Sequence, residues 1–169
     1  MTTISENPIV REAVPSDAHS VADIYNHYIG NTAITFEEEP VNAPEMAQRI
    51  SAVQSASLPW LIAISASVVV GYAYATPWKS RSAYRFSVET TVYLAPEHTS
   101  KGVGTVLYGR LLDILRARNI HCAMGGIALP NASSVALHEK FGFRNVARFH
   151  EVGFKFDQWI DVGYWQKNF

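Results

Sequence analysis

The spacing of hydrophobic and polar residues changes several times along the chain, and each change marks a boundary between predicted elements. Residues 9–14 alternate apolar and polar side chains, as a short strand does. Residues 16–30 begin with a Ser-Asp cap, present one apolar face at helical spacing and end at a glycine, which predicts a helix. A second helix is predicted to start near Pro44. Residues 61–64 and 68–74 predict two strands joined as a hairpin.

The strongest strand signal lies at residues 87–94, where alternate positions are apolar or threonine and point one way. Five elements follow it in the order helix, strand, helix, strand, strand, at 106–115, 122–128, 131–141, 143–149 and 159–167. The first of these helices is predicted to bury Val106 together with four leucines. This order of elements predicts a mixed α/β sandwich around one sheet, with a strand–glycine turn–helix unit at its centre.

Composition and charge limit the function classes. At 169 residues the chain is expected to form a single domain, residues 1–169. Its 14 basic and 15 acidic residues give a net charge of −1, which argues against a domain that grips nucleic acid. No cationic segment followed by an apolar stretch opens the chain, and its longest apolar run is interrupted, so neither secretion nor a membrane span is expected. The single cysteine, Cys122, has no internal disulfide partner, and we expect a reduced cytoplasmic setting.

A Gly-Val-Gly turn at 102–104 stands between the strongest strand and the longest helix. Glycines there let the backbone approach a ligand closely, and the start of a helix offers free N–H groups to an anion. Lys101 and Thr105 add a charge and a hydroxyl beside the turn. The pattern suits a pyrophosphate, while glycines at this place also arise from tight packing. The order Lys-Gly excludes a Walker loop, and Leu107 in place of a third glycine excludes a dinucleotide fingerprint.

Several motifs, in chain order, resemble those of the GCN5-related N-acetyltransferases (GNAT): VETTVYL at 88–94, TSKGVGT at 99–105, NASS at 131–134, and residues 137–138 and 142–143. Others resemble the phosphinothricin and methionine sulfoximine/sulfone acetyltransferase branch, at 71–73, 77–79, 83–85, 88–89 and 162–166. The resemblance extends from about residue 9 to 169 and implies an α+β fold with a mixed, mostly antiparallel sheet. It also implies acetyl-CoA as co-substrate and no metal. Thr99 stands where the family usually has Gln or Arg, and we expect Lys101 to supply that charge.

The resemblance assigns the donor site to the central strand and the glycine turn. The pantetheine arm is expected along Val92, Tyr93 and Leu94, whose backbone N–H groups would stabilise the thioester carbonyl. Asn131 is expected to bind the arm further along. The residues expected around the pyrophosphate are Ser100, Lys101, Gly102, Val103, Gly104 and Thr105.

Glu89 is the predicted general base, because the amine of an amino acid is mostly protonated at neutral pH and must lose a proton before attack. Its apolar neighbours in the strand favour a raised carboxyl pKa. The alternative is a solvated carboxylate, or one paired with Arg85. His138 stands where relatives often carry a tyrosine that acts as general acid, which implies that role or a relay with Glu89. Its alternative is a packed, hydrogen-bonded helix histidine.

The loop before the central strand carries three basic groups and two aromatic ones, a set that suits a small zwitterion whose carboxylate needs a charged fork. The resemblance places this loop on the acceptor side, with a further wall from the segment between the first two helices. The predicted substrate-binding residues are Phe36, Trp78, Lys79, Arg81, Arg85, Glu89 and Thr91. The alternatives are a solvated basic loop and a simple core position for Phe36.

The resemblance therefore implies an acetyl-CoA-dependent N-acetyltransferase for a small amino acid of the methionine sulfoximine, methionine sulfone or phosphinothricin type. One alternative is a transferase for a polyamine, an aminoglycoside or a protein N-terminus, whose cationic acceptor needs an acidic groove; the acidic cluster is at 37–39. Another is a non-catalytic acyl-CoA-binding sensor. Relatives of this kind form homodimers, and the aromatic residues near the end of the chain would suit such an interface or face inward: Phe154, Phe156, Trp159, Tyr164, Trp165 and Phe169. The histidines other than His138 show no metal-ligand spacing.

Overall fold

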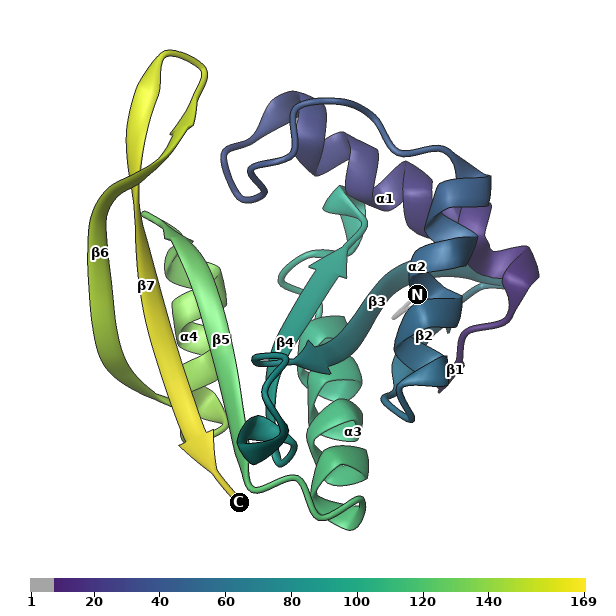
Figure 1. The fold of residues 1–169 in the computed structure, drawn as a ribbon. Coiled ribbons are helices and arrows are strands. Elements are labelled where there is room, and N and C mark those ends of the chain that lie inside the picture. The colour runs from purple at the N-terminus through teal and green to yellow at the C-terminus, as the bar shows by residue number, and fades with distance from the viewer. Residues whose placement is uncertain (1–7) are drawn as a thin grey trace.

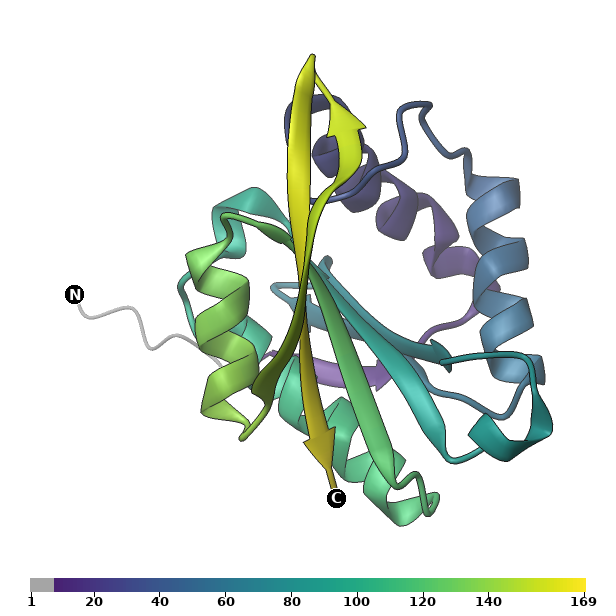
Figure 2. The same ribbon diagram turned by 60° about the vertical axis from the view of Figure 1, so that its left-hand side comes forward.

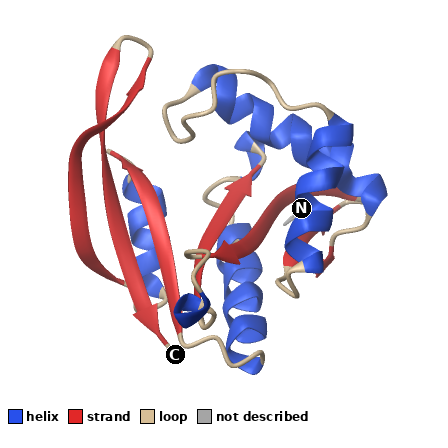
Figure 3. Cartoon of the chain, in the orientation of Figure 1, coloured by secondary structure: helices blue, strands red, loops and turns tan. Residues whose placement is uncertain are grey.

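Seven strands form one sheet in the computed structural model of this chain, which describes residues 8–169 (Figures 1 and 3). The strands are β1 (Ile9–Glu12), β2 (Trp60–Ser65), β3 (Val68–Pro77), β4 (Ser87–Leu94), β5 (Cys122–Leu129), β6 (Arg144–Lys155) and β7 (Gln158–Asn168). Their order across the sheet is β1-β2-β3-β4-β5-β7-β6, and only the β4–β5 pair is parallel. The expected mixed, mostly antiparallel sheet is confirmed.

Helices cover both faces of this sheet. They are α1 (Ala18–Asn31), α2 (Ala43–Ser55), α3 (Val103–Ala117) and α4 (Ala132–Lys140). The first two lie on one face, and α3 and α4 lie on the other (Figure 2). Leu107, Leu111 and Leu115 of α3 are completely buried, as their spacing predicts. Val106 was expected on the same face but is 39% exposed, because it lies at the edge of the apolar stripe, beyond the reach of the sheet.

The two parallel strands at the centre of the sheet separate soon after they pair. Their register covers only Ser87–Glu89 of β4 against Cys122–Met124 of β5. On their outer sides, β4 stays paired with β3 up to Leu94, and β5 stays paired with β7 up to Leu129. The facing edges beyond the paired segment therefore carry backbone N–H and C=O groups without a strand partner, which can bind a ligand instead. Figure 1 shows the two strands diverging in this way.

A buried polar contact lies where these strands part. The Thr90 hydroxyl donates to the backbone carbonyl of Met124 on β5 at 3.0 Å and is hydrogen-bonded to the Tyr108 hydroxyl of α3 at 2.8 Å. Both side chains are almost fully buried, so each polar atom depends on the other for a partner. This contact joins both strands and α3 at the base of the opening.

The last two strands form a long hairpin that projects beyond the rest of the sheet (Figure 1). The sequence pattern predicted the first of them at 143–149, which is too short, since β6 continues to Lys155. Two register shifts against β7 break its alternation, one of them between Phe149 and Gly153. The bulge there is held by Asp161, which accepts the backbone N–H of Glu151 at 2.9 Å.

One predicted cap is also wrong in detail. Asp17 precedes α1, but its carboxylate makes no cap bond to that helix. It accepts the backbone N–H of Val14 at 2.7 Å and pairs with Arg11 at 2.8 Å, so it fastens β1 to the helix entry. Within residues 8–169, no helix has the length and apolarity to cross a membrane.

Candidate active site

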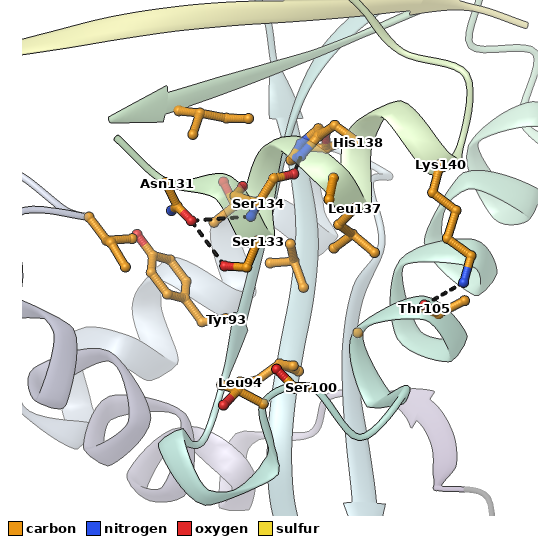
Figure 4. A pocket seen from close by; sticks show the side chains of 18 of the residues that line it. Tyr93, Leu94, Ser100, Thr105, Asn131, Ser133, Ser134, Leu137, His138 and Lys140 are labelled. Atoms are coloured by element: carbon orange, nitrogen blue, oxygen red, sulfur yellow. Dashed lines mark hydrogen bonds between the residues drawn. The ribbon is translucent and has the colours of Figure 1, made fainter. Parts of the chain in front are cut away.

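A cavity of about 590 Å³ lies between the diverging strands and extends to the first turn of α3 and to α4; we call it the groove cavity (Figure 4). Its lining includes Thr91, Val92, Tyr93 and Leu94 of β4 and residues 126–128 of β5. The unpaired edges of both strands therefore face one space. Of the residues expected at the donor site, the lining contains Val92, Tyr93, Leu94, Ser100, Gly102, Gly104, Thr105 and Asn131.

The glycine turn forms one end of the groove cavity. Gly102 is the N-cap of α3 and has φ +82°, in the left-handed region that favours glycine. The N–H groups of the first helical turn lack partners within the helix and carry the positive end of its dipole, so they form an anion site. Val103 is buried beneath the turn, and Lys101 is exposed and outside the lining.

A second cation near the turn comes from α4. The Lys140 ammonium donates to the Thr105 hydroxyl at 3.3 Å, and both residues line the groove cavity (Figure 4). Sequence reasoning missed Lys140 because nothing in its local pattern distinguishes it from a solvated residue in the last turn of a helix. It is adjacent to the turn only because α4 and α3 lie side by side.

Asn131 is the N-cap of α4, and its side-chain oxygen accepts the N–H of Ser134 and the hydroxyl of Ser133, each at 3.1 Å (Figure 4). This cap explains why the helix begins where it does. It also holds the Asn131 amide group at the cavity wall, on the strand side of α4.

A second cavity of about 520 Å³ lies between the segment 32–42 and the hairpin; we call it the hairpin cavity. Its lining is mostly apolar: Ile34, Thr35, Phe36, Glu89, Tyr93, Gly126, Ala128, Phe149, Val152, Val162 and Tyr164. Ile34, Tyr93, Gly126 and Ala128 line the groove cavity as well, so the two cavities meet at the divergence of β4 and β5. The hairpin residues were missed by sequence reasoning, because the bulge in β6 sets which of them face inward.

Glu89 is the one charged residue in the described lining of the hairpin cavity. Burial raises the pKa of its carboxyl group, and the positive charge of Lys79 partly opposes that rise. Arg85 does not pair with it, since its guanidinium lies over the Phe86 ring at 4.6 Å and donates to the Ser82 carbonyl. Glu89 thus has the environment expected of a proton acceptor, at the place where the cavities meet.

The other predicted acceptor residues are only partly brought together. Phe36 and Glu89 line the hairpin cavity, whereas Thr91 lines the groove cavity. Trp78 lies outside both linings, with its ring edge against Tyr164 at 5.4 Å, and the Lys79 ammonium lies over the Trp78 ring at 4.7 Å. The two arginines, Arg81 and Arg85, are exposed and outside both linings.

His138 is 3% exposed on α4 and lines the groove cavity. Its Nδ1 is hydrogen-bonded to the Ser134 carbonyl at 2.8 Å, so Nδ1 carries the proton of the neutral ring. Its Nε2 is buried against Gly125 and has no partner among the described residues. Burial lowers the pKa of His138, which keeps the ring neutral at pH 7.

Comparison with known proteins agrees with this architecture. The family model described as an acetyltransferase (GNAT) domain matches residues 10–163. The chain belongs to this family of acetyltransferases. It is 39% identical over 160 residues to a phosphinothricin N-acetyltransferase of Streptomyces viridochromogenes, covering 95% of this chain and 87% of that protein. It is 34% identical to an L-methionine sulfoximine/L-methionine sulfone acetyltransferase of Salmonella typhimurium, covering 93% of this chain and 92% of the other.

A solved relative contains the co-substrate. A GNAT phosphinothricin acetyltransferase from Sinorhizobium meliloti, in complex with acetyl-CoA, superimposes with a TM-score of 0.93 at 34% identity, covering 96% of this chain and 88% of that one. The residues of this acetyltransferase fit the same group: the first turn of α3 suits a pyrophosphate, and the unpaired edge of β4 suits the amides of a pantetheine arm.

Proposed function

We propose that this acetyltransferase transfers the acetyl group of acetyl-CoA to the α-amine of a small amino acid of the phosphinothricin, methionine sulfoximine or methionine sulfone type. The observation that carries the proposal is the position of Glu89. It is a carboxylate with no ion partner among the described residues, set where the groove cavity meets the hairpin cavity. An acetyl thioester in one cavity and an amine in the other would meet beside it.

The donor is held by backbone groups and by the charge of a helix end. Residues 102–105 would bind the pyrophosphate, helped by Lys140, and the free edge of β4 at residues 92–94 would bind the arm. An N–H of that edge, aimed at the thioester carbonyl, stabilises the oxyanion that forms on attack. One such preorganised donor contributes roughly 2.7–4 kcal/mol in acyl transfer.

Glu89 accepts the proton of the ammonium group, directly or through one water, and thereby makes the amine nucleophilic. Its raised pKa improves it as a base. The bond from nitrogen to the acetyl carbon forms, the C–S bond breaks, CoA leaves as the thiolate, and the proton that the new amide nitrogen loses goes to this thiolate or to water. The Glu89 carboxylate and the Tyr164 ring both lie against Gly126: a Cβ there would be 2.9 Å from Glu89 Oε1 and 3.2 Å from the Tyr164 ring. The amine therefore has a narrow approach.

For His138, burial supports the packing role over that of a general acid. A general acid needs a proton on an accessible nitrogen, and the proton of this neutral ring is committed to the Ser134 carbonyl. The pH–rate profile of the His138→Ala protein decides between the two roles. Loss of only the acid-group limb would establish proton donation, and an unaltered profile is the result we expect.

The acceptor's carboxylate would bind at the mouth of the hairpin cavity, because the described lining contains no basic residue. Lys79 is the nearest candidate, since its charge is felt at Glu89. Arg81 and Arg85 follow it in the same loop. A cationic acceptor is less well served: Glu37 of the acidic cluster is paired with Arg49 at 2.8 Å, and that cluster does not line the cavity.

We also propose that two copies associate through the hairpin. Six large apolar side chains of β6, β7 and the turn between them are about half exposed: Val146, Phe149, Val152, Phe154, Phe156 and Trp159. Trp165 is buried and not available to such an interface, whereas Phe149, Val152 and Tyr164 also line the hairpin cavity. Light scattering on the intact protein should give a dimer, and Trp159→Lys should shift it toward monomer. A monomeric parent protein would reject this.

The test of function is thiol release from acetyl-CoA with a panel of acceptors. Phosphinothricin, methionine sulfoximine and methionine sulfone should each be acetylated, whereas polyamines and aminoglycosides should not. Thiol release with cationic amines alone would indicate a transferase for a polyamine, an aminoglycoside or a protein N-terminus. Binding of acetyl-CoA without release, for every acceptor, would select a sensor.

A further inference from the structure

A buried lysine joins the hairpin to the segment that faces it across the hairpin cavity. Lys155, the last residue of β6, is 3% exposed. Its ammonium donates to the carbonyl of Ile29 at 2.8 Å and to that of Thr35 at 2.9 Å. These partners lie 126 and 120 positions away in the sequence. The lysine is therefore the polar link between two parts of the chain that meet only in the folded protein.

The surroundings of Lys155 favour a cation at this position, and loss of the ammonium would leave its buried carbonyl partners without a donor. Ile29 lies in the last turn of α1, where carbonyls lack helical partners and the dipole favours a cation. No carboxylate of the described residues lies within ion-pair distance of the ammonium. Burial lowers the pKa of Lys155, and the negative charge of Glu38 partly offsets that decrease. A buried charge of this kind is held by its two carbonyls, and they in turn depend on it.

Both linked segments contribute walls to the hairpin cavity, beside residues of β4, β5 and β7. Thr35 is flanked by Ile34 and Phe36, which line one wall, and β6 contributes Phe149 and Val152 to the other. Beside the lysine, the Phe36 ring packs directly on the backbone of Gly153, where a Cβ would overlap it. The ammonium and this aromatic contact set how far apart the walls stand.

We infer that Lys155 is a positioning residue that sets the width of the acceptor cavity by holding residues 32–42 against the hairpin. The inference rests on the proposed function, because it assigns the acceptor to this cavity. Neither Ile29 nor Thr35 lines the groove cavity, so we expect loss of the link to act on binding of the acceptor more than on binding of acetyl-CoA.

The decisive variant is Lys155→Met, which keeps an unbranched side chain of nearly the same length and removes the charge. We expect KM for the acceptor to rise roughly 10- to 100-fold, as for loss of a charged hydrogen bond, while KM for acetyl-CoA stays within about twofold. Lys155→Arg, which retains the charge, should recover part of the loss. Lys167→Met is the matched control: its ammonium donates to the Phe141 carbonyl at 2.8 Å, away from the hairpin cavity, and acceptor KM should not change.

Amide hydrogen exchange gives a readout that does not require activity. In Lys155→Met, exchange at residues 33–39 should become at least tenfold faster, with α3 unchanged, because the segment loses its link to the hairpin. Gly153→Ala disturbs the adjacent contact with Phe36 without removing the charge, and it should raise the acceptor KM too. If Lys155→Met does not fold, Gly153→Ala and Lys155→Arg together test the inference. Unchanged acceptor KM and exchange, or an equal rise in both KM values, would overturn the inference. A parent protein that acetylates no acceptor would instead refute the proposed function, and the exchange result would still stand.

Discussion

Replacement of Gly126 by alanine tests the approach of the amine to Glu89 with a single methyl group. Gly126 lies on β5 where the two cavities meet, and its backbone is in an ordinary extended conformation that alanine adopts without strain. The new Cβ would lie 2.9 Å from Glu89 Oε1 and 3.2 Å from two atoms of the Tyr164 ring. An unstrained contact needs about 3.5 Å, so the carboxylate must move by roughly 0.5 Å.

The expected effect is on catalysis and not on the fold. The Glu89 side chain is flexible and free of ion pairs among the described residues, so it can turn away at little cost in stability. A misplacement of about 1 Å at a reacting centre costs about 100-fold in rate, so we expect kcat/KM for the acceptor to fall roughly 10- to 100-fold. The temperature of unfolding should change by no more than about 2 °C, as for a surface substitution.

The assay is thiol release at varied acceptor and acetyl-CoA concentrations, with binding of CoA measured separately by calorimetry. Gly30→Ala is the matched control, because a Cβ there meets nothing within 4 Å and lies on α1, away from both cavities. It should leave all kinetic constants unchanged. Wild-type kcat/KM in a folded Gly126→Ala protein would refute the approach of the amine to Glu89 beside Gly126.

Three further predictions follow from the same contacts. Glu89→Gln should lower turnover by roughly 10²–10⁴-fold without loss of acetyl-CoA binding. Because burial raises the pKa of Glu89, its ionised form destabilises the folded state at pH above that raised pKa, so this variant should unfold at a higher temperature there. The difference should shrink as pH falls through the folded pKa and vanish below the ordinary carboxyl pKa. Lys79→Met removes a charge that lowers the pKa of Glu89, so the rising limb of the pH–rate profile should move to higher pH. If the limb does not move, the charge of Lys79 does not act on Glu89. Thr90→Val leaves the Tyr108 hydroxyl buried without a partner and should lower the free energy of unfolding by about 1–3 kcal/mol in denaturant titrations, while Thr90→Ser should not.

Local pattern was sufficient for most of the elements and for the glycine turn, whereas the donor-site residues were expected from the resemblance to the family. The strand predicted at 87–94 matches β4 to the residue, because β3 pairs with it along nearly its whole length. Gly102 was informative because only a residue tolerant of φ +82° fits the start of α3 there. Asn131 begins the helix predicted at 131–141, and in the structure its side chain caps that helix. In each case the physical constraint acts within a few residues, so the sequence alone contains it.

Where the pattern was misleading, the deciding contacts come from distant parts of the chain. β6 was predicted too short because Asp161 of β7 holds a bulge that interrupts its alternation. Arg85 could have been a partner of Glu89 from its place in the sequence, but in the fold it turns to Phe86. A hydrophobic period reports which face of an element is buried, and not which other element covers it.

On the acceptor side, some features follow from the local sequence and others follow from the fold alone. Local sequence is enough to predict a glycine turn before a helix, a carboxylate in an apolar strand and the order of elements that brings them together. The fold is needed to see that the other wall comes from a hairpin near the end of the chain, which Lys155 links to carbonyls more than a hundred positions earlier. The physical reason is that backbone carbonyls are the same in every residue, so their partners are chosen by packing and leave no mark in the local sequence.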